Sequence, residues 1–511
     1  MKGALERISC GLLLCLAWVL ASCGDEGPLL AMVDSGPDVP KPTFTLEQLK
    51  DPDNCKDCHP VHYESWSGSM HAYAADDPIF LAMNEKGQKE AGIGNFCVKC
   101  HAPMAIGPDD ALVDRAALVA LPKSKRGVTC YFCHSIEQVD GQHNNPIVLA
   151  QDGVMRGQLS DAVPNKAHAS AYSPLLDEKN LQSAAACGAC HDILNGNGVH
   201  LERTFAEWEE SVFSTHLGNT CAQCHMKPER DKLVADGPDA PGVFLRTRHD
   251  HGFPGVDVAL TPWPQIEEQR AAIQELLDYT LQSALCVAGV QGGAPAIFAI
   301  IDNVGAGHKW PSGAAQDRRA WVEITAYQGG NVIYQTGVVP PGTEPTKLVD
   351  PDFWLIRDCS LDADGNEVHM FWEVKESDPN LLPVLSTFDR GKQEFYMLHQ
   401  LQRFPRNPRD ALSAIPDRVT MSVWLLAFPL DVFDKLFEKP EEQGFTAEEV
   451  RAMRAKLTPF RVGPEIVWTT DALRAPSYRD GSLPVYCVSS SPSFDFRATK
   501  TPAPRHRICS P

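Results

Sequence analysis

Five copies of the pattern Cys-x-x-Cys-His lie within residues 55–225, and this density constrains the fold more than any other feature of the chain. The pattern is typical of c-type haem attachment, in which two thiols bond to the haem vinyl groups and the histidine coordinates the iron. So few residues per macrocycle cannot build a conventional apolar core. We therefore expect the porphyrins to form the core of this region, wrapped by short helices and loops. The five motifs are Cys55-Lys-Asp-Cys58-His59, Cys97-Val-Lys-Cys100-His101, Cys130-Tyr-Phe-Cys133-His134, Cys187-Gly-Ala-Cys190-His191 and Cys221-Ala-Gln-Cys224-His225.

Pairs of cysteines two residues apart also occur in zinc ribbons and in thiol oxidoreductases. A zinc ribbon does not require histidine directly after the second cysteine, and a redox dithiol would not be repeated five times. The recurring histidine therefore favours five covalently bound haem c groups. In this interpretation the proximal iron ligands are His59, His101, His134, His191 and His225.

The start of the chain has the character of an export signal. Lys2 and Arg7 precede an apolar run, Cys10–Leu20, that is too short to span a bilayer. The run ends in Leu20-Ala-Ser-Cys23, which resembles a bacterial lipobox. We expect residues 1–22 to be a lipoprotein signal peptide and Cys23 to be lipidated. Ordinary signal-peptidase cleavage near the same place, or no cleavage, are the alternatives.

The residues after Cys23 suggest where such a lipoprotein would reside. Gly24 occupies the place at which inner-membrane lipoproteins commonly carry aspartate, so we expect an outer-membrane lipoprotein that faces the periplasm or the cell surface. Residues 23–45 contain Gly, Pro and acidic residues without periodicity, which is typical of a flexible tether.

Four of the seventeen cysteines lie outside the leader, the lipobox and the motifs: Cys286, Cys359, Cys487 and Cys509. An even number in an oxidising compartment favours two disulfides. The sequence does not determine the pairing. Our preferred assignment joins Cys487 to Cys509 and Cys286 to Cys359.

The formal net charge of −20 argues against nucleic-acid binding. It suits redox partner proteins with basic faces, metal cations or a cationic small substrate. The same charge also keeps an exported protein soluble, so it selects no single partner.

The sequence pattern predicts an α+β chain in three parts. Residues 46–257 hold every motif and form a mostly helical and loop-rich pentahaem domain. Residues 258–290 carry an apolar stripe at helical spacing, including Ile266, Ile273 and Leu277, and predict a linking helix. Residues 291–511 predict a β-sandwich-like domain with a helical insertion.

The evidence for that last part is a series of strand and turn patterns. A capping box, Thr446-Ala-Glu-Glu449, precedes the expected inserted helix. The strands are expected at Ala296–Ile301, Trp321–Tyr327, Asn331–Thr336, Arg418–Phe428 and Glu465–Thr469.

Whether each iron has a sixth ligand decides between an electron conductor and a catalyst. Most single histidines are surface or hydrogen-bonded residues, but local context favours five as distal ligands. One follows the first motif, one lies on a Gly/Asn-rich loop after the third, one precedes the fourth, and two lie in glycine-containing loops. These distal candidates are His71, His143, His168, His251 and His308.

Several stretches of the chain resemble the doubled-CxxCH multihaem cytochromes c, the group related to the nitrifiers' tetrahaem cytochrome and hydroxylamine oxidoreductase. They cover roughly residues 50–340 and are strongest in the haem region. The stretches are Trp66–Ala72 after the first motif, Cys97–Pro103, Gly127–Ile136, Thr204–Trp208 with Cys221–Lys227, and Gly305–Gly313.

The resemblance implies that His71, His143, His168, His251 and His308 lie where such proteins place distal ligands, with His62, His200, His216 and His249 in reserve. Members of the group mostly carry electrons through packed bis-histidine haems, and some act on small nitrogen compounds at one open haem. No motif here has lysine in place of its histidine, and no tyrosine is evident as a haem cross-link.

We therefore expect a pentahaem lipoprotein that transfers electrons in the bacterial cell envelope, with other cytochromes or an extracellular acceptor among its redox partners. The alternative is an oxidoreductase that acts on a nitrite-like or hydroxylamine-like compound at one open haem. An electron-transfer protein is the favoured interpretation, and no residue is assigned a catalytic role.

Overall fold

The computed structural model describes residues 40–107, 114–236, 242–384, 386–389 and 394–502, with the side chains of 385–398 excepted. By its internal contacts the chain divides into two units, Met1–Pro40 and Lys41–Pro511. The expected signal peptide, Cys23, Cys509 and His506 lie outside the described residues.

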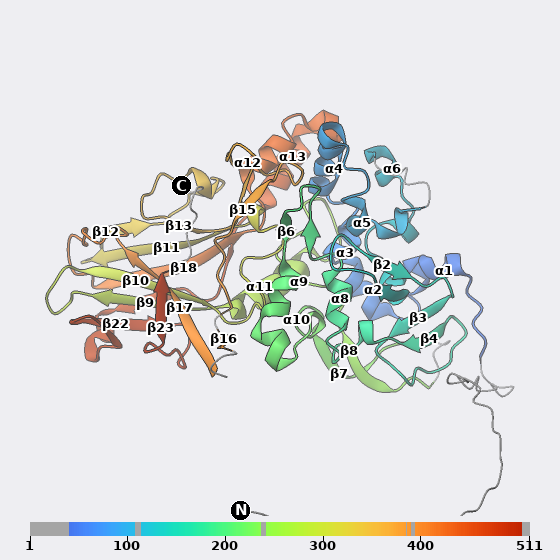
Figure 1. Cartoon of the computed structure of the whole chain (residues 1–511), viewed down its shortest axis with the longest axis horizontal. Helices are drawn as coiled ribbons and strands as arrows, with labels where there is room; N and C mark the ends of the chain where they lie inside the picture. Colours follow the sequence, from blue (N-terminus) through green and yellow to red (C-terminus); the bar gives the residue numbers. More distant parts are fainter. Residues whose placement is uncertain (1–39, 108–113, 237–241, 385, 390–393, 503–511) are drawn as a thin grey trace, which may run out of the picture. The chain divides into compact units, whose positions relative to one another are not determined.

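The motif-bearing region consists of short helices joined by loops and two-stranded ribbons (Figure 1). Four of the five motifs include a helical segment, and polar caps fix where two of these begin. The Thr129 side chain accepts from the Phe132 amide, and Thr220 forms a capping box with Gln223. The helices here are α1 (Leu46–Lys50), η1 (Pro52–Asn54), α2 (Pro60–Ser67), α3 (Met70–Tyr73), α4 (Pro78–Ala91), α5 (Val98–His101), η2 (Pro103–Ala105), α6 (Arg115–Val119), η3 (Lys123–Lys125), α7 (Cys130–His134), η4 (Pro174–Leu176), α8 (Ser183–Gly188), α9 (Thr204–Glu210), η5 (Phe213–Leu217) and α10 (Cys221–His225).

The ribbons of this region are short. Three of them, β1–β2, β5–β6 and β7–β8, are antiparallel, and the pair β3–β4 is parallel. Their strands are β1 (Ile136–Val139), β2 (Ile147–Leu149), β3 (Val154–Gly157), β4 (Ala169–Tyr172), β5 (Ile193–Leu194), β6 (His200–Glu202), β7 (Pro228–Leu233) and β8 (Leu245–His249).

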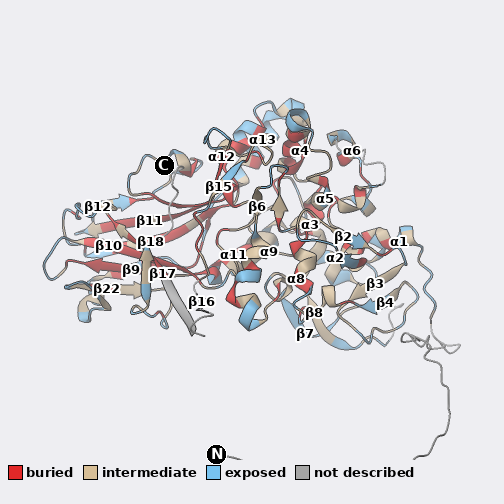
Figure 2. Cartoon of the chain, viewed as in Figure 1, coloured by how far each residue is buried: buried red, intermediate tan, exposed pale blue. Residues whose placement is uncertain are grey.

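Buried side chains are distributed unevenly along the chain. Figure 2 shows them as continuous runs along β9, β10, β11 and β18, but as scattered positions among the short helices. The largest apolar cluster made only by the motif-bearing region is small and centres on Phe80, Val98 and Leu118. This scarcity agrees with the expectation that cofactors supply much of the core there.

The second half contains two sheets. The seven-stranded sheet has the order β16-β17-β10-β9-β22-β21, with β23 beside β17. The six-stranded sheet has the order β12-β11-β18-β19, with β13 beside β11 and β20 beside β18. The strands are β9 (Leu281–Ala288), β10 (Ala296–Asn303), β11 (Arg319–Gln328), β12 (Asn331–Thr336), β13 (Trp354–Ile356), β16 (Ser386–Asp389), β17 (Glu394–Phe404), β18 (Arg418–Leu426), β19 (Phe460–Arg461), β20 (Ile466–Thr469), β21 (Tyr478–Asp480), β22 (Leu483–Ser489) and β23 (Thr499–Pro502), and a separate ribbon pairs β14 (Cys359–Leu361) with β15 (Glu376–Asp378).

One apolar core joins the two sheets. Val287 and Ile297 of the first sheet belong to the same buried cluster as Val322 and Met421 of the second. Each such side chain contributes about 1.5–3 kcal/mol when it is fully buried. The mixed α+β class is thus confirmed, and the strands expected near 296–301, 321–327, 331–336, 418–428 and 465–469 are all present.

The expected linking helix over residues 258–290 is wrong in its second part. Helix α11 (Ile266–Thr280) ends at Thr280, and the chain continues directly as strand β9 between β10 and β22. Leu285 and Val287 face the shared core, whereas Ala284 and Cys286 pack in a cluster on the opposite face. A strand buried on both faces is apolar at every position, so its periodicity does not distinguish it from a helix.

The preferred disulfide assignment is also wrong. Cys286 is bonded to Cys487, with 4.0 Å between the Cα atoms, because β22 lies beside β9 and places the two cysteines directly opposite each other. Cys359 is disulfide-bonded as well.

The helical insertion connects the second half to the motif-bearing region. It consists of α12 (Leu430–Leu436), η8 (Pro440–Gln443) and α13 (Ala447–Lys456), and the expected capping box of Thr446 and Glu449 begins α13. Phe433 of α12 and Met453 of α13 share a buried cluster with Ala82 of α4, and these helices lie together in Figure 1. The described part of the chain contains no helix that is both long and apolar enough to cross a bilayer.

Candidate haem-binding site

None of the ten motif cysteines forms a disulfide, in contrast to Cys286 and Cys487. Burial raises the pKa of the Cys97 and Cys133 thiols to about 12, whereas neighbouring thiols lower the pKa values of Cys55 and Cys187. Among the described residues, no group of three or more potential metal donors within 4.8 Å of one another includes a motif cysteine. The zinc alternative therefore finds no support in the geometry.

Cysteines of different motifs lie beside one another. The Cys55 thiol affects the pKa of Cys130, Cys187 affects that of Cys221, and Cys100 affects that of Cys190, so the members of each pair lie close together. These contacts place motif one against motif three, and motif four against both two and five. The Cys133 thiol also interacts electrostatically with Cys187, which connects motif three to motif four. Motif four is thus a junction that contacts three others.

Backbone carbonyls orient the motif histidines. The Nδ1 atoms of His59, His101, His134 and His225 lie 2.8, 3.2, 2.5 and 2.8 Å from the carbonyl oxygens of Val234, Ala74, Arg156 and Pro254. A carbonyl can only accept, so each Nδ1 donates and each Nε2 keeps its lone pair. This is the arrangement that a metal-ligating histidine requires.

Three of the expected distal histidines share this arrangement. The Nδ1 atoms of His168, His251 and His308 lie 3.1, 2.9 and 2.8 Å from the carbonyl oxygens of Ala169, His249 and Lys309. Their Nε2 atoms are therefore available as well.

Three pairs of imidazoles face each other at a separation that suits a bound iron. The ring centroids lie 6.3 Å apart for His59 and His168, 6.4 Å for His134 and His251, and 6.3 Å for His191 and His71. Metal–imidazole bonds of about 2 Å place two axial rings about 6 Å apart. Each of these pairs therefore has the spacing of a bis-histidine haem.

His308 lies next to the fifth motif, although it belongs to the second half of the chain. Among the other histidines, His225 lowers the pKa of His308 most, followed by His191. Its loop is docked on the end of α11, where a Cβ on Gly305 would lie 2.3 Å from the Tyr279 carbonyl oxygen. The glycine thus permits a close approach to backbone, and the Asn303 side chain holds the His308 carbonyl at 2.7 Å.

The facing histidines are held neutral by burial. Burial lowers the pKa of His71 to about 3, and those of His191, His251 and His308 to about 4. Desolvation disfavours the imidazolium and so preserves the lone pair that iron uses. The residues present therefore fit haem iron.

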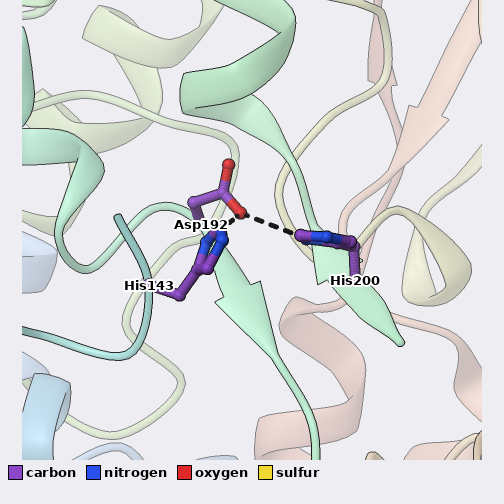
Figure 3. A group of neighbouring side chains, drawn as sticks. All are labelled: His143, Asp192 and His200. Carbon is purple, nitrogen blue, oxygen red and sulfur yellow. Dashed lines mark ion pairs between the residues drawn. The ribbon is translucent and has the colours of Figure 1, made fainter. Parts of the chain in front are cut away.

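His143 has a different environment. The structure places it against Asp192 and His200, with 2.9 Å between His143 Nδ1 and Asp192 Oδ1, and its described ring contact is with His200 (Figure 3). The sequence reasoning did not single out Asp192, although its position directly after the motif histidine His191 was a usable signal.

His101 has a different environment from the other motif histidines. Phe80 of α4 stacks on its ring at 4.3 Å with an interplanar angle of 3°. His101 lowers the pKa values of His71 and His191, whose rings form one of the three pairs. Among the ring contacts of the described residues, none joins His101 to a second imidazole.

The reserve histidines have other partners. His62 lies between two facing pairs, 4.9 Å from the His251 ring and 5.7 Å from the His59 ring, and burial lowers its pKa to about 2. His249 Nε2 lies 2.9 Å from a Glu178 carboxylate oxygen, and His216 is exposed.

Comparison with known proteins agrees with this geometry. Residues 54–135, which include the first three motifs, match the family "Cytochrome c554 and c-prime". The fold is similar to that of a penta-heme cytochrome c552 from Thermochromatium tepidum, with a TM-score of 0.53 and 18% identity over 82% of this chain and 99% of that one. No curated protein matches the chain. The family match and the structural similarity support the assignment of this chain as a multihaem cytochrome c.

Proposed function

We propose that this multihaem cytochrome c relays electrons through five covalently bound haems. The observation that carries the proposal is the set of facing imidazole pairs, at 6.3–6.4 Å between ring centroids. Imidazole on both faces of an iron leaves no position for substrate and suits electron transfer. Haems attached to the neighbouring cysteines of different motifs would lie close to one another, as a relay requires.

The mass of the purified protein tests the number of haems. We expect five covalently attached haems, and replacing both cysteines of any one motif with alanine should remove one. A mass that corresponds to four or fewer haems in the unaltered protein would contradict the proposal.

The proposed location is the outer membrane, through lipid on Cys23. The support is the apolar run that ends at Leu20-Ala-Ser-Cys23. Cys23→Ser should abolish incorporation of labelled fatty acid and shift the protein from the membrane fraction to the soluble periplasmic fraction. Unchanged fractionation of the unlabelled variant would argue for another mode of anchoring.

The second candidate function is oxidoreduction of a small nitrogen compound at the haem of the second motif. The observation that favours it is that His101 has no ring contact with a second imidazole among the described residues, whereas Phe80 stacks on the face of its ring. A haem with one protein ligand has an open position for a small molecule.

Electron paramagnetic resonance of the oxidised protein separates these functions. One stoichiometric high-spin signal that cyanide or nitrite converts to low spin, and that disappears in Cys97→Ala/Cys100→Ala, would assign the open haem to the second motif. Five low-spin haems would show a relay without a substrate site.

A further inference from the structure

A second type of ligand cluster lies beside the haem motifs. His143 comes from the loop between β1 and β2, Asp192 directly follows the fourth motif, and His200 begins β6 (Figure 3). Asp192 Oδ1 lies 2.9 Å from His143 Nδ1 and 3.6 Å from His200 Nδ1, and all three atoms lie within 4.8 Å of one another. The two imidazole rings meet edge to face, with 5.0 Å between their centroids.

These three atoms lack hydrogen-bond partners although they are buried. Asp192 Oδ2 accepts from the Ala206 amide at 3.2 Å, whereas Oδ1 and the two Nδ1 atoms are in contact only with one another among the described groups. A buried carboxylate oxygen without a partner is costly, and a cation between the three atoms would satisfy all of them.

The backbone around the cluster is held in place by other bonds. The Asn144 side chain donates to the Leu194 carbonyl at 2.8 Å and accepts from the Leu194 amide at 3.1 Å. Asn144 and Asn145 adopt left-handed backbone angles, with φ of 60° and 57°, which persist only where surrounding contacts enforce them. The β5–β6 ribbon pairs Leu194 with His200 and so fixes His200 near Asp192.

We propose that His143, Asp192 and His200 bind a divalent first-row transition-metal ion that is separate from the haem irons. Two imidazoles and one carboxylate suit such ions, whereas calcium and magnesium prefer oxygen ligands. Bonds of about 2.0–2.2 Å place donor atoms about 3–4 Å apart, which matches the two measured separations after a small adjustment. The side chains of His143 and His200 are 26% and 35% exposed, so an ion can enter and keep water in its remaining positions.

Zinc titration of the haem-loaded protein tests this proposal. After treatment with a chelator, isothermal calorimetry or competition with a zinc-sensitive dye should show one Zn²⁺ site. His200→Gln and Asp192→Asn should each weaken it by at least about tenfold. His216→Gln, which alters an exposed histidine, is the matched control and should bind zinc as the unaltered protein does. Haem content by mass should be equal in all four proteins.

Two results would overturn the proposal. One is zinc binding that is absent from the unaltered protein or equal in His200→Gln. The other is a loss of one low-spin haem signal in metal-free His143→Gln, which would make His143 a haem ligand and leave Asp192 as its hydrogen-bond partner. The haem count and the relay are independent of either result.

Discussion

His308 belongs to the second half of the chain and lies near the motif histidines His225 and His191. Its Nδ1 donates to the Lys309 carbonyl, His225 is the histidine that lowers its pKa most, and its loop is held by Gly305 and Asn303. We expect the Nε2 atom of His308 to coordinate the haem iron of the fifth motif. Replacing His308 with methionine should then give this iron a sulfur ligand in place of a nitrogen ligand.

His308→Met is therefore expected to raise the midpoint potential of one haem, because methionine favours reduced iron more than histidine does. A spectroelectrochemical titration would show one component moved to higher potential and the others unchanged. His216→Met is the control and should leave the titration as it is. An unmoved titration in His308→Met would remove His308 from the ligand set.

Asp358 makes stability depend on pH. Burial raises its pKa to about 7, although the Asn380 amide, at 3.1 Å, stabilises the carboxylate. Because the folded pKa lies above the unfolded one, the stabilisation is complete below about 4 and is lost as pH rises through about 7. Asp358→Asn cannot ionise and should show a smaller loss of thermal stability between pH 5 and pH 8. An equal loss in both proteins would assign the pH dependence to other groups.

At the scale of elements, the strands of the second half could be predicted from local sequence, whereas the strand β9 could not. Ala296–Ile301 and Trp321–Tyr327 are short apolar runs bounded by turns, which indicate strands without reference to their neighbours. Leu281–Ala288 follows a helix without a turn residue, and only its position between β10 and β22 decides its conformation. The order of strands in a sheet depends on segments far apart in the chain. The same order places Cys487 of β22 beside Cys286 of β9 and so determines the disulfide.

Removing the β9–β22 disulfide should destabilise the second half. Cys286→Ser/Cys487→Ser opens a loop between residues 201 positions apart, and removal of a native disulfide typically costs about 2–5 kcal/mol. Denaturant unfolding followed by tryptophan fluorescence would measure the change. Non-reducing peptide mapping of the unaltered protein should yield a fragment that links Cys286 to Cys487. A fragment that links Cys487 to Cys509 would contradict the structure.

For the whole molecule, the negative charge should control encounters with redox partners. The formal net charge is −20, and haem propionates add further negative charge. Reduction by a cationic complex such as hexaammineruthenium(II) should slow as salt is added, because screening removes the attraction. Reduction by anionic dithionite is the matched comparison and should accelerate. Stopped-flow absorbance at several ionic strengths would test both, and two rates that respond alike would exclude steering by net charge.

The haem arrangement as a whole was only partly predictable. The motifs identify the proximal histidines by their spacing, and local context selected His71, His168, His251 and His308 as candidates. The sequence does not show that His168 faces the first motif or that His71 faces the fourth, because these pairs join segments far apart in the chain. The sequence does not show that Asp192 and His200 lie beside His143, because the β5–β6 ribbon, a feature of the fold, brings them together.

The position of His308 has a consequence for how the protein matures. A chain is synthesised and begins to fold from its N-terminus, so Cys221, Cys224 and His225 emerge about eighty residues before His308. With His308 as the sixth ligand, a haem attached early to the fifth motif would keep an exposed iron until β10 and its following loop arrive. Assembly of the second half would then be the step that ends the reactivity of this iron towards oxygen and peroxide.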